Sequence, residues 1–183
     1  MSFVYTKSLL LWSFVIALIP VFALIISLAV KSFYLLQYIH VLTGGTWTGF
    51  DLFMGLVMTR VMKNLDTAAR VEVAKRLTPT TFFIMPSLAS VAIASGIYLA
   101  SEMDIFNIYS PWIIAAGIVV IILSGQGFGI FMPNGLRIFI ELSKPKPDSE
   151  KISRLNMQNI RLAGSQAFFQ VALILIMAHL AVY

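Results

Sequence analysis

The sequence contains no cysteine and few charged residues. Only 11% of its 183 residues are Asp, Glu, Lys or Arg, whereas soluble domains average about 25%. The absence of cysteine excludes disulfide bonds and thiolate metal sites. Motifs of common soluble enzymes, such as G-x-S-x-G, a nucleotide-binding glycine loop or H-E-x-x-H, are also missing. Whether the chain is an enzyme is left open; any chemistry is expected to belong to a bound cofactor rather than to protein side chains alone.

What the chain has instead is apolar sequence, which makes up 59% of it. Five runs approach or exceed the roughly 20 residues that a helix needs to cross a bilayer. We therefore predict an all-α, polytopic membrane helix bundle with five transmembrane helices, forming one domain over residues 1–183 of a multi-pass cell-membrane protein. The first run is too long for a typical signal-peptide core, which favours a retained helix. The predicted helices cover about 9–30, 33–58, 80–100, 112–132 and 162–183.

The basic residues predict an orientation. With the N-terminus inside, twelve of the 13 Lys and Arg residues fall on the inner side, and Lys31 alone falls outside. This asymmetry follows the positive-inside rule and predicts that the C-terminus faces outside. The net charge of +5 is then explained by basic cytoplasmic loops that meet membrane lipids, and no nucleic-acid partner is expected.

Both long inner loops show helix signals. Asp66 or Thr67 is a candidate N-cap for a helical segment that Pro79 is expected to interrupt. Asp148 and Ser149 are candidate caps for a helix that leads into the last span, and Pro133 is expected to mark the inner end of the fourth. Because both loops are cationic, they suit either anionic headgroups or another membrane subunit.

The second predicted span carries the residues that are least expected in lipid. His40, Gly44, Trp47 and Asp51 recur at helical spacing and share one face. Small residues beside this face, Gly45 and Gly49, form a G-x-x-x-G pair, and the fourth span has another at Gly125 and Gly129 around Gln126. Such pairs allow a helix or a flat ligand to approach closely, and helix packing is their commonest use.

His40 and His179 are the only two histidines. In the predicted topology both lie near the outer surface, at depths that differ by roughly 6 Å. Four interpretations remain open: the pair holds a b-type haem, the pair holds copper with a thioether such as Met177, a single histidine is a ligand, or His179 lies in the wet interface with Tyr183 and only His40 is buried.

Asp51 is expected roughly 16 Å deeper than His40 along the helix axis. A carboxyl group there should be protonated, paired or hydrated. Gln126, Gln166 and Gln170 are candidate hydrogen-bond partners for it. The functional interpretation is a proton relay or a contact to quinone, and the structural alternative is a hydrogen bond that fixes helix packing.

Two segments carry a family resemblance. "HVLTGGTWTG" and "RLTPTTFFIMPSLASVAIASGIYLA" resemble the first and second helices of a group of small membrane proteins that includes copper-resistance D-type proteins and the small haem-associated protoporphyrinogen oxidases. The resemblance covers about residues 35–183. It implies a haem or copper ligand at His40 and a redox or metal-handling membrane protein.

The resulting prediction is a small redox subunit of the membrane. It is expected to bind haem b through His40, with His179 as the candidate second ligand and Gly44 and Trp47 beside the cofactor, and to exchange electrons with quinone or a respiratory complex. The alternatives are a copper permease or copper-handling protein, and a cofactor-free structural subunit. In each case other membrane subunits or further copies of the chain are the expected partners.

Overall fold

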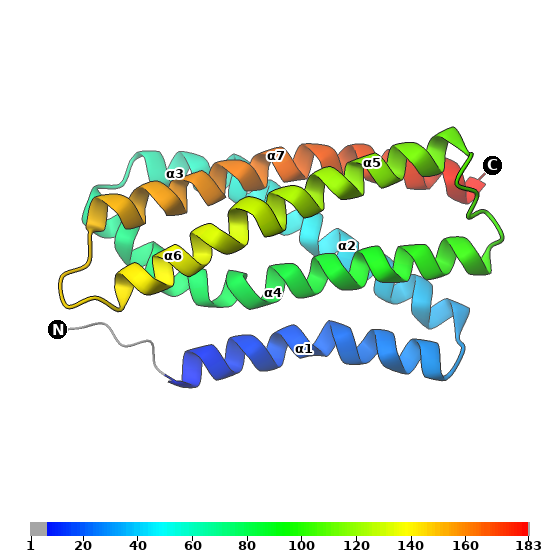
Figure 1. Cartoon of the computed structure of the whole chain (residues 1–183), viewed down its shortest axis with the longest axis horizontal. Helices are drawn as coiled ribbons and strands as arrows, with labels where there is room; N and C mark the ends of the chain where they lie inside the picture. Colours follow the sequence, from blue (N-terminus) through cyan, green and yellow to red (C-terminus); the bar gives the residue numbers. More distant parts are fainter. Residues whose placement is uncertain (1–6, 183) are drawn as a thin grey trace.

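The computed structural model describes residues 7–182, and all of its regular structure is helical (Figure 1). This confirms the all-α prediction. Within the described residues, four helices are long and apolar enough to cross a membrane: 9–29, 67–102, 111–142 and 149–182. The elements in chain order are α1 (Lys7–Ala29), α2 (Phe33–Leu52), η1 (Phe53–Met58), α3 (Thr59–Lys63), α4 (Thr67–Glu102), α5 (Pro111–Gln126), η2 (Gly127–Phe131), α6 (Met132–Leu142) and α7 (Ser149–Val182).

The second predicted span is helical over its whole expected range. α2 continues without a break through the π-helix η1 into α3, and α5 continues in the same way through η2 into α6. The α2–η1–α3 helix is not among the four helices that are apolar enough to be membrane spans by composition. Its polar residues, such as Thr43, Thr48 and Asp51, are buried within the bundle, so its low apolar content reflects the face that it turns towards other helices.

The long helices run side by side (Figure 1). α1 packs against α4 and α2 at one edge, and α7 packs against α2, η1, α4, α5 and α6. The outer surface is apolar: Trp12, Ile121, Phe168 and Leu175 are 64%, 72%, 73% and 72% exposed. An exterior of large apolar side chains suits lipid rather than water. The chain is a small, multi-pass membrane protein.

One end of the bundle, which we call the basic end, collects the starts of α1, α4 and α7 and the ends of α3 and α6 (Figure 1). The predicted caps there are confirmed. Asp66 caps α4 by accepting a 2.7 Å hydrogen bond from the Ala69 amide, and α7 begins at Ser149 with Asp148 accepting from the Lys151 amide at 3.0 Å. The last predicted helix therefore starts earlier than residue 162; its final residue, Tyr183, lies outside the described residues.

Two predictions about proline were wrong. α4 runs through both Pro79 and Pro86 to Glu102, and the fourth span passes Pro133 and ends at Leu142. Pro79 is fully buried, so packing against the neighbouring helices offsets the lost backbone bond. Pro133 is the second residue after η2, where the regular i→i−4 pattern has just been interrupted and a missing N–H costs less.

The closest helix crossing uses glycines outside the expected pairs. A Cβ atom on Gly55 of η1 would collide with the backbone of Gly164 on α7. By contrast, a Cβ on Gly45, Gly49 or Gly125 would meet no atom within 4 Å. The glycines at 45 and 49 therefore face outwards in this chain, and it is Gly55 that brings α7 close to the second helix.

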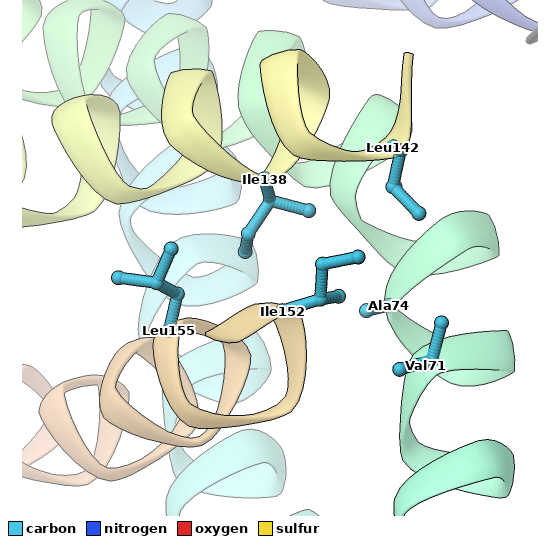
Figure 2. Packing of buried hydrophobic residues seen from close by; sticks show 6 residues of the cluster. All are labelled: Val71, Ala74, Ile138, Leu142, Ile152 and Leu155. Atoms are coloured by element: carbon cyan, nitrogen blue, oxygen red, sulfur yellow. The ribbon is translucent and has the colours of Figure 1, made fainter. Parts of the chain in front are cut away.

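An apolar cluster closes the basic end of the bundle. It joins α4, α6 and α7 through the six residues shown in Figure 2: Val71, Ala74, Ile138, Leu142, Ile152 and Leu155. Beside it, the buried Glu141 carboxylate pairs with Lys144 at 2.9 Å and with Lys151 at 2.8 Å. These contacts tie the end of α6 to the start of α7.

Candidate functional site

A cavity opens inside the bundle, between α2–η1, α4, α5–η2–α6 and α7. It offers about 110 Å³ to the centres of water-sized molecules, whereas one water needs roughly 10–15 Å³ by that measure. Most of its wall is apolar or aromatic, including Phe50, Phe82 and Met85. A small number of polar side chains interrupt this wall, which is the usual character of a site for a small organic ligand.

Asp51 lies on this wall and is 2% exposed. Gln170 of α7 donates a hydrogen bond from Nε2 to its Oδ2 at 2.9 Å, and the Trp47 indole, one turn before Asp51, lies near the same carboxyl group. Of the three glutamines that were candidate partners, Gln170 makes this bond. Asp51 is thus held between two helices while it borders an open space.

Asn156 of α7 also lines the cavity, and sequence reasoning missed it. It is 4% exposed, and its Nδ2 group has no hydrogen-bond partner among the described residues. A buried donor without a partner is costly unless a ligand or water satisfies it. A signal was present in the sequence, because Asn156 lies seven residues before the buried Ala163 and fourteen before Gln170, on the inward stripe of α7.

Both π-helices border the cavity. η1 contributes Met54, and η2 contributes Gly127, Phe128 and Phe131. π-Helical turns are rare and are frequently found at functional sites. Pro86 of α4 also lines the cavity.

The other two glutamines connect α5 and α7. Gln126 donates to the Ser165 hydroxyl at 3.3 Å, and Gln166 donates to the Leu123 carbonyl at 3.1 Å. Gln166 lines the cavity, as does Trp47, but Gly44 does not. The predicted proton-relay residues therefore divide into two groups. Gln170 bonds to Asp51, and of these two only Asp51 lines the cavity, whereas Gln126 and Gln166 bond between α5 and α7.

His40 lies outside the cavity and packs against α4. Its Nδ1 atom is 2.9 Å from the Ala92 carbonyl and 3.1 Å from the Ser95 hydroxyl. Because a carbonyl can only accept, Nδ1 carries the proton, and in a neutral ring Nε2 then holds the lone pair. Gly96 permits this packing, since a Cβ there would lie 2.9 Å from the imidazole Cε1.

If a haem or a copper ion is bound, Nε2 is the ring nitrogen of His40 that could hold it, because Nδ1 is already bonded. A histidine whose Nδ1 is fixed by a backbone carbonyl is arranged as in many metal sites, with Nε2 available as ligand. His179 instead stacks on Trp112 of α5, with ring centroids 3.9 Å apart and a tilt of 30°. Among residues 7–182, no three His, Asp or Glu side chains gather closely enough to hold a metal ion.

Comparison with known proteins finds no matching protein family, no similar curated protein and no similar solved structure. The resemblance to copper-resistance D-type and haem-associated proteins stays a prediction. The fold and the site define a class: a small polytopic membrane protein whose helices enclose a largely apolar cavity with buried polar groups on its wall.

Proposed function

We propose that this protein binds a quinone-class ligand in the Asp51 cavity and serves as a small redox subunit of the membrane. The observation that carries the proposal is the Asn156 amide, which has no hydrogen-bond partner among the described residues and lies in the wall of a largely apolar cavity. A quinone presents a flat ring to apolar and aromatic walls and carbonyl oxygens to donors. Asn156 would donate to one of these oxygens, and Asp51 would exchange a proton with the ligand when a partner subunit reduces or oxidises it.

The same proposal includes the membrane arrangement. The α2–η1–α3 helix acts as the fifth span, because its polar groups face the bundle and its exposed residues, such as Val41 and Leu56, are apolar. The basic end faces the cytoplasm, in agreement with the positive-inside rule. A cysteine introduced at an exposed position of the 102–111 loop should then react with an impermeant thiol reagent from the outside only.

Trp47 provides a direct test of ligand binding, because it is the one of the chain's three tryptophans that lines the cavity. In a Trp12→Phe, Trp112→Phe background, decylubiquinone should quench the remaining fluorescence with saturation. Asn156→Leu should weaken binding about five-fold, the worth of one net hydrogen bond. Gln158→Leu, an exposed change on the same helix outside the cavity, should not. Quenching without saturation, or quenching that is equal in the Asn156 and Gln158 variants, would contradict the proposal.

A second candidate is a haem b or copper ion ligated by Nε2 of His40, favoured by the carbonyl that fixes the opposite ring nitrogen. The bound group would supply one-electron chemistry, and His40 would hold and orient it. The protein purified from its membrane should then show a haem absorption band after dithionite reduction, or bound copper by elemental analysis, and His40→Ala should lose it. A folded protein that stays colourless and copper-free after expression with added haem and copper would remove this candidate.

A further inference from the structure

A second hollow lies on the outside of the bundle between η2–α6 and α7, separate from the Asp51 cavity. Its volume is about 550 Å³, and it is bordered by two arginines, Arg137 of α6 and Arg161 of α7. Both side chains belong to exposed residues, and neither has an ionic or hydrogen-bond partner among residues 7–182. Two guanidinium groups that are not paired within the protein and border one hollow can bind an anion together.

The other polar groups of the hollow are also arranged to donate. Asn134 forms its floor and is 3% exposed; its Nδ2 donates to Oδ1 of Asn159 at 3.0 Å and to Oε1 of Gln158 at 3.4 Å. Because Oε1 of Gln158 accepts this bond from Asn134, the NH₂ group of Gln158 can donate to a ligand in the hollow. Ser165 accepts from Gln126, so its hydroxyl proton remains available. Guanidinium, amide and hydroxyl donors together match a phosphate group.

The depth of the hollow matches the headgroup region of a bilayer. A helix crosses the hydrocarbon core in about 20 residues. Counted from the end of the bundle opposite the basic end, 20 residues of α5–η2 reach Ile130, and 20 residues of α7 counted back from Val182 reach Ala163. Among the residues that border the hollow, Arg137 and Arg161 lie beyond these limits, on the side of the basic end. Ile130 lies at the limit itself.

An acyl chain also has a path from this hollow. Ile130 lies at its edge and is 43% exposed, and Phe168, two turns along α7 from Arg161 and on the same face, is 73% exposed. Gly129 leaves room at the entrance, because a Cβ there would meet no atom within 4 Å. The groups that could bind a phosphate therefore lie next to an apolar surface.

We propose that this hollow binds the phosphate headgroup of an anionic phospholipid, with Arg137 and Arg161 on the phosphate and the acyl chains along Ile130 and Phe168. The site is independent of the cavity and of the function proposed for it. A free phosphate would satisfy the same donors but would gain nothing from the apolar path, so the test separates the two sources.

Binding can be measured on the full chain in neutral detergent by native mass spectrometry with dioleoyl phosphatidylglycerol as the probe. Arg137→Gln/Arg161→Gln should weaken its binding about 30-fold, because each basic residue near the lipid contributes roughly a five-fold factor. The matched control is Arg60→Gln/Arg154→Gln, which removes the same charge from exposed positions outside the hollow and should retain binding within about two-fold. Gly129→Leu keeps every charge, fills the entrance and should also weaken binding.

Three results would overturn the proposal. Phosphatidylcholine could bind as tightly as phosphatidylglycerol, which would remove the requirement for an anion. The two double variants could lose binding equally, which would indicate general charge attraction rather than a site. Inorganic phosphate at millimolar concentration could displace the lipid fully and protect the protein from thermal unfolding as well as the lipid does, which would identify a free anion as the ligand.

Discussion

Gln170 donates a 2.9 Å hydrogen bond to Asp51 across the interior of the bundle, from a position 119 residues later in the chain. Both side chains are 2% exposed. The bond uses only half of the glutamine amide, because Oε1 of Gln170 is buried without a partner among the described residues. The contact therefore holds α2 to α7 while one of its acceptors stays unsatisfied.

This asymmetry predicts an unusual result for Asp51→Asn. The new amide would keep an oxygen for Nε2 of Gln170 and place an NH₂ group opposite the unpartnered Oε1, so that two hydrogen bonds replace one. We expect the thermal unfolding temperature in detergent to equal or exceed that of the wild type. Circular dichroism at 222 nm against temperature measures it.

Gln170→Leu provides the opposite change. It removes the donor and leaves the Asp51 carboxyl group with fewer partners, so it should lower the free energy of unfolding by roughly 0.6–1.7 kcal/mol, the range for interhelical hydrogen bonds in membrane proteins. In the Asp51→Leu background, Gln170→Leu should lower the free energy of unfolding by less. A strongly destabilised Asp51→Asn variant would show that the carboxyl group itself, rather than its hydrogen bond, is required.

The crossing of Gly55 and Gly164 predicts a sharp difference between glycines of the same helix. Gly55→Ala would force a methyl group into the Gly164 backbone and should destabilise the protein by about 1–3 kcal/mol, the usual cost of overpacking. Gly49→Ala places the same methyl group in open space and should be neutral or slightly stabilising, since alanine favours helix. Equal effects of the two changes, measured by thermal unfolding, would contradict the close approach.

Glu141 predicts a stability effect at the basic end. Its buried carboxylate pairs with Lys144 and Lys151 and also accepts from the Asp148 amide at 3.3 Å, so Glu141→Gln leaves two ammonium groups unpaired and weakens the connection between α6 and α7. We expect a lower unfolding temperature. Glu72→Gln breaks an exposed ion pair with Arg76 and should change the unfolding temperature little, because surface ion pairs contribute little to stability. A Glu72 effect as large as that of Glu141 would contradict this.

Much of the fold follows from local patterns in the sequence. The long apolar runs predict the membrane helices, and Asp66 and Asp148 predict where helices begin, because capping is a local interaction. The continuation of α4 through Pro79 and of the fourth span through Pro133 was not predictable in this way. At Pro79, packing against distant helices outweighs the tendency of proline to end a helix, and at Pro133 the π-helical turn does so. Neither cause can be read from the residues that flank the proline.

The site shows the same limit. Helical spacing correctly placed Trp47 and Asp51 on one buried face, and it suggested glutamines as partners for the carboxyl group. It did not show that His40 would lie against α4 outside the cavity, since that depends on the absence of a side chain at Gly96, 56 residues away. Asn156 was missed because a buried donor without a partner is recognisable only once its neighbours are known.

The contact of His40 with Gly96 supplies a last prediction, which separates a structural role of this histidine from a ligand role. Gly96→Ala would place a methyl group 2.9 Å from the imidazole Cε1 and should displace the ring from the Ala92 carbonyl, lowering the free energy of unfolding by about 1–2 kcal/mol. In a His40→Ala background the obstacle is gone, so the same change should be nearly neutral, and the difference between the two backgrounds is the coupling between these residues. The role of His40 can then be tested. If His40 only holds α2 against α4, Ser95→Ala, which removes the second partner of its Nδ1, should also destabilise the protein without changing any absorption spectrum. If Nε2 also holds a cofactor, Gly96→Ala should shift or abolish the visible absorption together with the loss of stability. Additive effects of Gly96→Ala and His40→Ala would mean that the two residues do not touch in the native protein.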